Sequence, residues 1–560
     1  MGERPAPRAV LAILLVCGAT IFAGLGSTSL WEPDEPRFAA ATRQMLATGD
    51  YLTPWFNGRP RFEKPIVFYW MQAVPFALLG PTETAARLPA AITGTLAVLL
   101  LYAIGRRTLS DRAALAGAVV LATSFRFVIY CRQGLTDVPV LFLVVAALWG
   151  FFRGLEEPAR SRRYAGLAWA CIGLAVATKG PVAVIPLLVW VPYLALSRQL
   201  RLGLARMHIV SGAILALVIA APWYLYMIAV HGRAYVDHAL GYELVRRYAD
   251  AEFPGPKRGF LYYFGVWPGD AAPWTIFFLA ALAWIGRRWG TLEPRERQGL
   301  LLTGTWFAVV LLLFSSASGK LPHYLLPLYP PLALIVGFFA DRAGRAASPE
   351  TPGLSWRLAV GLTSALLVAA AVLVALFLRG AFGVAPTALG MVLPVLLLAG
   401  GVLAAVFEWR RQRQAIVVSL VAVLASAYAL LGTHIAPRYL QDMQPVRALG
   451  QAVAAEALPG DRLGHYGSFG GPGLVYYSGR VVEFLPTHDA VAEFLSGEGR
   501  RFCVLSAGDL EAVEQRPHPP LHVLARRGVL NVRFKRVLEG RAADPRRDLL
   551  LVSNLLAASR

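Results

Sequence analysis

Long apolar runs, each close to the length of a membrane-spanning helix, follow one another through residues 1–436. A span needs roughly 20 apolar residues, and clusters of arginine mark its cytoplasmic end. Counting and orienting the runs predicts about thirteen transmembrane helices, with the C-terminus outside. Because 56% of the residues are hydrophobic and only 16% are charged, a soluble protein is excluded. The predicted spans lie near 9–29, 86–104, 113–130, 138–152, 164–178, 181–196, 208–230, 271–286, 300–316, 323–340, 356–378, 386–407 and 415–434.

The formal net charge of +20 reflects this topology. The basic residues fall mostly in short clusters between apolar runs, as in the cytoplasmic loops of membrane proteins, so no nucleic-acid partner is predicted. The four cysteines share no metal-ligand or CxxC spacing. Residues 1–30 resemble a signal peptide, but their apolar core is about as long as a span and no convincing cleavage site follows it. We therefore interpret this segment as the first transmembrane helix.

An unusually charged loop, 31–85, follows the first span and lies outside in this topology. Its apolar run 66–80 is short and holds Gln72 and Pro75. Counting that run as a span would place Arg106 and Arg107 outside, against the charge rule. We therefore predict an interfacial or re-entrant helix there.

Residues 437–560 lack any run long enough to span. The pieces LVYYSGRVVEF, RFCVLSA and LLLVSN are typical of strands, and 486–496 is typical of a helix. The chain is thus predicted to have two parts: a transmembrane domain, 1–436, and a small soluble α/β domain, 437–560, outside the membrane. The chain has no internal repeat, which disfavours the inverted-repeat transporter folds.

The unusual polar clusters all fall on the predicted outer side. Charges near a bilayer are costly unless they pair or face a watery cavity, so they are candidates for function. The candidates are Asp34, Glu35, Arg37, Glu63, Lys64, Asp137, Lys179, Arg246, Arg247, Lys320, His323 and Tyr324.

Each candidate carboxylate has a structural and a functional interpretation. Asp34 suits a helix start, but it could also take a proton from an acceptor hydroxyl. Asp137, two residues before Pro139, also suits the start of a helix, and it could instead orient substrate or stabilise positive charge on a sugar ring. Both interpretations stay open from spacing alone.

Lysines are rare in this arginine-rich chain, and Lys64, Lys179 and Lys320 all lie at outer span ends. One by one they are interface anchors. Together with Arg37 they form a candidate site for a phosphate at headgroup height, to which His323 and Tyr324 could also donate. Three further histidines, His231, His238 and His434, lack metal-ligand spacing.

Several motifs occur in a characteristic order: DEPR, FNG and FEKPxxxYW within 31–70, RLP (87–89), RQGLTDVP (132–139), TKGP (178–181) and SGKLPHYLLPLYPPLA (318–333). This order resembles the membrane glycosyltransferases with the C-type fold, in the branch that holds protein O-mannosyltransferase-like enzymes and bacterial aminoarabinose-lipid A transferases. The resemblance covers most of the first 340 residues.

The resemblance implies a polyprenyl-phosphate-linked sugar as donor. It implies that Asp34 lies at the catalytic centre, that Asp137 is a second important aspartate, and that Arg37, Lys64 and Tyr324 hold the lipid phosphate. Lys320 is a further candidate for the phosphate, and Glu35, Glu63, Lys179, Arg247 and His323 are candidates for a supporting role.

A divalent metal ion at the site is possible but has no support in the sequence. In the aminoarabinose branch a histidine-containing stretch joins the FEKP glutamate in binding a metal, whereas the corresponding stretch here, ADAEFPGPKRGFLYYF, has no histidine. No cofactor is therefore required by this interpretation, and Glu63 is not assigned as a metal ligand.

We expect an inverting transfer of a sugar to a lipid A-like, glycan or protein acceptor at the outer face of the bacterial cytoplasmic membrane. The alternative is a transporter or flippase for lipid-linked sugars, which would need polar residues deep inside several spans and broken helices at matching positions in two halves.

Overall fold

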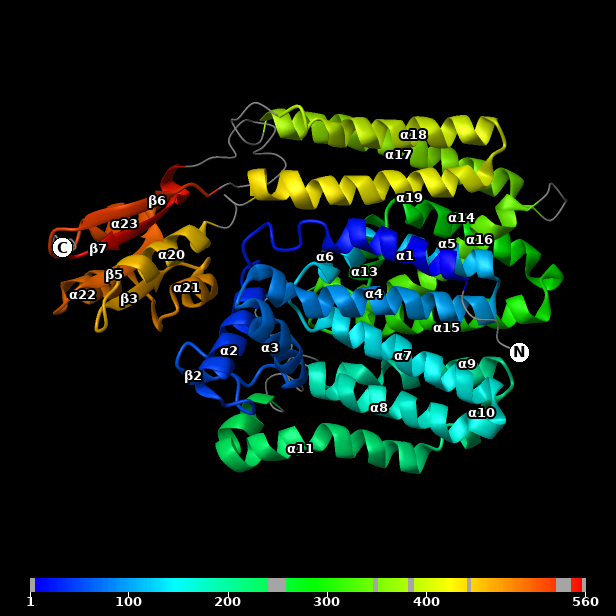
Figure 1. The fold of residues 1–560 in the computed structure, drawn as a ribbon, viewed down its shortest axis with the longest axis horizontal. Helices are drawn as coiled ribbons and strands as arrows, with labels where there is room; N and C mark the ends of the chain where they lie inside the picture. The colour runs from blue at the N-terminus through cyan, green and yellow to red at the C-terminus, as the bar shows by residue number, and fades with distance from the viewer. Residues whose placement is uncertain are drawn as a thin grey trace.

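Helices dominate the computed structural model, which describes residues 6–239, 258–345, 351–380, 387–440, 445–529 and 545–555. The long helices lie side by side in one bundle, and the C-terminal sheet with its helices sits beyond one end of that bundle (Figure 1). That same end carries the helices of the loop 31–85.

Eight of the described helices are long and apolar enough to cross a membrane. Two further pairs of helices pass the same test together but are bent, by 64° and 112°. The first pair is α5 (Asp111–Ala122) with α6 (Phe125–Cys131), and the second is α13 (Tyr262–Asp270) with α14 (Trp274–Arg288). The eight are α4 (Glu83–Thr108), α7 (Asp137–Glu156), α11 (Ile209–Val236), α15 (Pro294–Ser316), η6 (Pro322–Leu328) continued by α16 (Tyr329–Gly344), α17 (Gly353–Gly380), α18 (Val392–Trp409) and α19 (Arg413–Leu430).

The fold class is confirmed as a polytopic helical membrane protein, and eight to ten helices of its described part are candidate spans by length and composition. The predicted first span is only α1 (Pro7–Cys17) with one π-helical segment, η1 (Gly18–Phe22). The run 181–196 is divided into η3 (Pro181–Val184) and α9 (Ile185–Leu196). Helix α8 (Ser161–Lys179) is long enough, but it carries charged residues at both ends. Each of the thirteen predicted runs therefore contains a helix in the described part of the chain, and these three fall short of the length or composition of a full span.

The loop 31–85 folds into two helices and a small hairpin. Helix α2 (Asp34–Thr48) packs against α3 (Val67–Leu79), which holds the run predicted to lie at the interface and is shorter than a span. Between them, β1 (Trp55–Phe56) pairs with β2 (Arg59–Pro60) in antiparallel register. The turn residues Asn57 and Gly58 have positive φ values of 54° and 76°, which explains the Asn-Gly pair of the FNG motif, because such hairpin turns need two left-handed residues.

The C-terminal part forms a five-stranded mixed sheet in the order β4-β3-β5-β7-β6. The parallel pairs are β3 with β4 and β3 with β5, and β7 runs antiparallel to β5 and β6. The strands are β3 (Arg462–Tyr466), β4 (Val482–Leu485), β5 (Arg501–Ser506), β6 (His522–Arg527) and β7 (Leu549–Ser553), and the helices are α20 (Val446–Glu456), α21 (Gly471–Ser478), α22 (His488–Ser496) and α23 (Ala507–Val513).

The predicted α/β character of this part is confirmed, and RFCVLSA, LLLVSN and 486–496 form β5, β7 and α22. The prediction for LVYYSGRVVEF was half wrong, because its first half lies in α21 and only Val482–Leu485 forms a strand. Glycines in the left-handed conformation, Gly470 and Gly479, bound α21 at its two ends. The boundary between residues 436 and 437 stays a prediction.

The C-terminal part packs on the charged loop through a shared apolar cluster. Leu30, Ala39 and Phe76 contribute from the loop, and Val446 and Leu474 contribute from the C-terminal part. The cluster excludes water from both parts at once, and burial of apolar surface is the main favourable term in such contacts.

Polar contacts between the loop and the C-terminal part lie around this cluster. The side chain of Asn57 donates to the carbonyl of Val482 (2.8 Å) and accepts from its amide (2.7 Å). The guanidinium of Arg43 donates to the carbonyl of Tyr476 at 2.6 Å, and the amide of Gly473 donates to Glu32 at 2.6 Å. The C-terminal part therefore holds the segment from which α2 begins.

Candidate active site

Asp34 is the first residue of α2, where the positive end of the helix dipole favours a carboxylate. Its Oδ1 lies 3.8 Å from a guanidinium nitrogen of Arg37, one turn later, and both side chains are largely exposed. An exposed pair at this distance adds little stability, so the carboxylate and the guanidinium are both accessible to a ligand.

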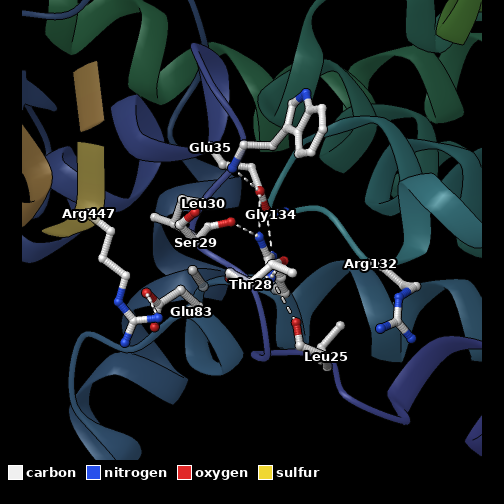
Figure 2. Close-up of polar contacts among 12 residues, drawn as sticks. Leu25, Thr28, Ser29, Leu30, Glu35, Glu83, Arg132, Gly134 and Arg447 are labelled. Atoms are coloured by element: carbon white, nitrogen blue, oxygen red, sulfur yellow. Dashed lines mark hydrogen bonds and ion pairs between the residues drawn. The ribbon is translucent and has the colours of Figure 1, made fainter. Parts of the chain in front are cut away.

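Glu35, the next residue, has a different environment: its side chain is 1% exposed. Both carboxylate oxygens accept from Arg87 of α4 at 3.0 Å, and they also accept from the amides of Gly134 (2.5 Å) and Trp31 (2.6 Å). Figure 2 shows Glu35 next to Gly134, with Ser29 and Leu30 close by. We therefore infer that Glu35 holds three segments in place and does not face a substrate.

Arg87 completes this buried group by donating to the carbonyls of Leu25 (2.9 Å) and Ser29 (2.8 Å). Sequence reasoning quoted the RLP motif that begins at Arg87 but gave this residue no role. An arginine at the start of an apolar run was the available signal, because a charge there requires a partner. Glu83, four residues earlier on α4, pairs with Arg447 of the C-terminal part at 3.1 Å (Figure 2).

Asp137 is the first residue of α7, and 9% of its side-chain surface is exposed. Its Oδ1 accepts from the ammonium of Lys179, the last residue of α8, at 2.6 Å. The Nε2 atom of His323, in η6, lies 3.8 Å from the same oxygen. Three candidates that are far apart in the sequence therefore meet around one carboxylate.

Aromatic rings enclose this carboxylate and its partners. The ring of Tyr130 stacks on that of His323 with a centroid distance of 5.1 Å. The ring of Tyr324 lies 4.9 Å from His323, and the ammonium of Lys179 lies 5.5 Å from the centroid of Tyr324. Aromatic faces attract such a cation and exclude water from its surroundings.

Asp34 belongs to the same neighbourhood. The charges of Asp34 and Asp137 both act on His323, and both also act on Tyr130. The charge of Lys64 acts on Asp137. Asp34 is therefore close enough to this pair of rings to interact with them electrostatically, as is Asp137, which also has Lys179 in direct contact.

A second ion pair lies next to these rings and was missed by sequence reasoning. Arg126 of α6 donates to Asp270, the last residue of α13, at 2.5 Å, and the hydroxyl of Tyr329 donates to the other oxygen at 3.2 Å. Both charges lie where a span is bent. A lone arginine and a lone aspartate inside apolar runs were the signal that could have found this pair.

Lys64 and Glu63 lie in the chain between β2 and α3. The ammonium of Lys64 donates to the carbonyl of Glu63 at 3.0 Å. The carboxylate of Glu63 accepts from Arg61 at 3.3 Å and is 40% exposed. Nearby, the rings of His231 and His238 lie 5.2 Å and 6.0 Å from that of Phe62.

Glu63 does not belong to a cluster of metal ligands in the described part of the chain. Among the described residues, no group of three or more His, Cys, Asp or Glu side chains is close enough together to hold a metal ion. Glu63 has an arginine beside it instead of a second ligand. No chemical step is therefore assigned to a metal.

Lys320 is buried and is placed differently from the other two lysines. Its ammonium donates to the carbonyls of Ala317 and Arg258, and its own carbonyl accepts from the guanidinium of Arg258 at 3.0 Å. Burial lowers the pKa of Lys320. In the described part of the chain, this lysine thus joins two backbone segments rather than the carboxylate of Asp137. Arg246 and Arg247 lie outside the described residues.

Comparisons with known proteins identify a matching family and several relatives. The family described as dolichyl-phosphate-mannose-protein mannosyltransferase matches residues 63–226. An undecaprenyl phosphate-alpha-4-amino-4-deoxy-L-arabinose arabinosyl transferase of Pseudomonas aeruginosa is 30% identical over 470 residues, which cover 81% of each chain. A protein of the same description from Pseudomonas fluorescens is 33% identical over 371 residues, but this match spans only 63% of each chain.

Solved structures share the fold. The crystal structure of ArnT from Cupriavidus metallidurans bound to undecaprenyl phosphate superposes with a TM-score of 0.79 at 22% identity, covering 99% of this chain and 100% of that chain. An oligosaccharyltransferase of Archaeoglobus fulgidus superposes with a TM-score of 0.51 at 14% identity, covering 89% of this chain and 69% of that chain. The fold is that of the C-type membrane glycosyltransferases.

The chain belongs to the family of the undecaprenyl phosphate-alpha-4-amino-4-deoxy-L-arabinose arabinosyl transferases. It is thus a multi-pass membrane glycosyltransferase. This finding confirms the resemblance that the ordered motifs indicated.

Proposed function

We propose that the chain transfers an aminoarabinose-type pentose from an undecaprenyl-phosphate-linked donor to lipid A or a similar lipid. The reaction takes place at the outer face of the bacterial inner membrane. Kinship with the Pseudomonas transferases supports the donor and the acceptor. The observation that carries the proposal is that Lys179 and His323, which are far apart in the printed sequence, both contact the carboxylate of Asp137 at the end of the bundle where α2 begins.

The orientation of the chain follows from its arginines. Arg106 and Arg107 end α4, and Arg287 and Arg288 end α14, at the end of the bundle opposite to the C-terminal part. Under the positive-inside rule that end faces the cytoplasm. The candidate site and the C-terminal part then face outward.

The cations are proposed to hold the lipid phosphate. Cleavage of the bond between the sugar and the phosphate leaves negative charge on the phosphate, and cations already in place stabilise that charge more in the transition state than in the ground state. We assign this role to Arg37, Lys64 and Lys179, with the hydroxyl of Tyr324 as a further donor. Lys320 has a positioning role in this proposal because its ammonium bonds to carbonyls.

The acceptor attacks the sugar from the face opposite to the phosphate, so the configuration inverts. A phosphate acceptor is already ionised and needs no base, and in that case Asp34 orients the sugar. A hydroxyl acceptor would need Asp34 to take its proton. Asp137 fixes Lys179 through the contact at 2.6 Å and thereby positions a cation for the leaving phosphate.

The test is transfer of aminoarabinose to lipid A in membranes of a host that lacks its own transferase. Mass spectrometry of lipid A measures the product in the presence of the wild-type chain, Asp34→Asn, and the control Glu514→Gln at the exposed end of α23. We expect product with the wild type and the control, and a loss of about 10²-fold with Asp34→Asn at equal protein level, because Asp34 orients the sugar for attack by the lipid A phosphate.

Two outcomes would contradict the proposal. Full turnover by Asp34→Asn would remove Asp34 from the catalytic centre. Movement of the lipid-linked sugar across proteoliposomes without any glycosylated product would support the alternative of a flippase.

A further inference from the structure

A cavity of about 1260 Å³ lies at the end of the bundle that we assign to the cytoplasm. It is lined by the last turns of α4 and α7, the first turns of α5 and α15, and the chain that follows α9. These helix ends lie on the right in Figure 1, away from the C-terminal part. The cavity is therefore separate from the candidate active site at the other end of the same helices.

The wall of this cavity changes from apolar to basic along α4. Leu99 and Ala103 line it one to two turns before Arg106 and Arg107. Leu99 and Arg107 are eight residues apart in the sequence, which corresponds to about 12 Å along a helix. Phe152 adds to the apolar part, and Arg295 adds to the basic part. The lining thus has the polarity of a lipid, with an ionic end toward the cytoplasm and an apolar end toward the bilayer.

The basic part carries more cations than carboxylates. Arg106 pairs with Asp111 at 2.6 Å, and Arg107 pairs with Glu156 at 3.0 Å. The third arginine, Arg295, donates to the carbonyls of Arg106 (2.7 Å) and Arg107 (3.0 Å). Asp111 and Glu156 are the only carboxylates among the lining residues, so the three arginines exceed them by one charge.

One of these carboxylates is shared with a further arginine. Glu156 also accepts from Arg153 at 2.7 Å, and Arg153 pairs in addition with Glu157, so these two residues together leave the excess of one positive charge unchanged. The excess of positive charge therefore lies on the side of the cavity where Arg107 and Arg295 meet, and an anion of suitable size would complete the charge balance.

We propose that this cavity binds an anionic membrane phospholipid, with its phosphate against Arg107 and Arg295 and its glycerol and first acyl carbons along Leu99, Ala103 and Phe152. Basic pockets between transmembrane helices on the cytoplasmic side are suited to such headgroups. A free phosphate ion would satisfy the arginines but would leave the apolar part of the wall in contact with water. The lipid explains both parts of the lining.

The test measures binding of cardiolipin, phosphatidylglycerol, phosphatidylcholine and inorganic phosphate to the full-length protein in detergent, by native mass spectrometry and by the midpoint of thermal unfolding. The double variant Arg107→Gln/Arg295→Gln removes the proposed phosphate contacts. Because Arg295 also bonds to the end of α4, a second variant, Ala103→Phe, fills the apolar part and leaves every charge in place. Arg410→Gln, on the exposed end of α18, is the control for nonspecific attraction of anionic lipids.

We expect the two anionic lipids to raise the unfolding midpoint of the wild type, and phosphatidylcholine to leave it unchanged. Loss of two arginine contacts should weaken lipid binding by about 10- to 30-fold, Ala103→Phe should weaken it comparably, and Arg410→Gln should bind like the wild type. The proposal is overturned if Arg410→Gln weakens binding as much as the double variant, if Ala103→Phe binds lipid normally, or if inorganic phosphate stabilises the protein as strongly as the lipids do.

Discussion

The ammonium of Lys179 lies 2.6 Å from Oδ1 of Asp137, so the last residue of α8 is fixed to the first residue of α7. The carboxylate of Asp137 is thereby oriented toward Lys179, with His323 at 3.8 Å on the same oxygen. Charged groups that are 9% and 16% exposed need such partners. This pair connects two of the ordered motifs, RQGLTDVP and TKGP.

Substitution of Lys179 by methionine is expected to lower turnover by about 10²-fold, because the leaving phosphate loses a cation and Asp137 loses its partner. Lys179→Arg should retain more activity than Lys179→Met, since the charge is kept. The measurement is product per unit of folded protein in the lipid A assay. Arg233→Met, which removes a cation that is 92% exposed, is the control, and equal loss in that variant would contradict a specific role for Lys179.

Substitution of Arg87 by methionine is expected to destabilise the protein by about 3–5 kcal/mol, because it leaves the carboxylate of Glu35 buried without its cation. Three segments of the chain meet at the ion pair between Arg87 and Glu35. The beginning of α2, which carries Asp34, should therefore also shift in this variant. Thermal unfolding in detergent measures the first effect, and turnover of the remaining folded protein measures the second. An unchanged unfolding midpoint would show that this buried group is not needed for stability.

The burial of Glu32 predicts a dependence of stability on pH. Burial raises the pKa of Glu32 from its ordinary value of 4.5 to about 7. The hydrogen bond from the Gly473 amide and the charge of Arg37 act in the opposite direction but are weaker. A raised pKa means that the folded state binds the proton more tightly. The stability that the protonated Glu32 contributes to the folded state is therefore fully present below pH 4.5 and is lost as the pH rises through about 7.

Glu32→Gln tests this dependence, because the amide oxygen can still accept from Gly473 but no longer titrates. We expect the unfolding midpoint of the wild type to fall by a few degrees more than that of Glu32→Gln between pH 5 and pH 8. Parallel curves for the two proteins would contradict the assignment.

Asn57 provides a prediction about the attachment of the C-terminal part. Its side chain makes two hydrogen bonds with the backbone of Val482, and each such bond contributes roughly 1 kcal/mol. Asn57→Ala is expected to speed hydrogen–deuterium exchange at the amide of Val482 and its neighbours in β4. Gln515→Ala replaces an exposed residue in the same part of the chain and should leave this exchange as it is in the wild type. Unchanged protection in Asn57→Ala would show that the apolar cluster alone holds the two parts together.

Much of the fold follows from local sequence signals, and the site follows from them only in part. The apolar runs located the long helices, whereas the hairpin at Asn57 and Gly58 was not predicted, although the FNG motif was noted. The short helix α9 and the bend between α5 and α6 could not be predicted, since an apolar run does not specify whether its helix is long or continues straight. Tertiary contacts decided those cases.

The partners of the charged residues could not be predicted from the sequence. Asp34 and Glu35 are adjacent in the chain, yet the first is exposed and the second is held by Arg87. Lys64, Lys179 and Lys320 had the same sequence context, and the structure places Lys179 on a carboxylate and Lys320 on carbonyls. Which side chains meet depends on packing between helices that are far apart in the chain, and no local pattern records it.

The apolar cluster that joins Leu30, Ala39 and Phe76 to Val446 and Leu474 has a consequence for protein engineering. A chimera that takes its outer part from one homologue and its bundle from another would bring mismatched surfaces together beneath Asp34. Exchange of acceptor preference between relatives by grafting should therefore move 31–85 and 437–560 as one unit.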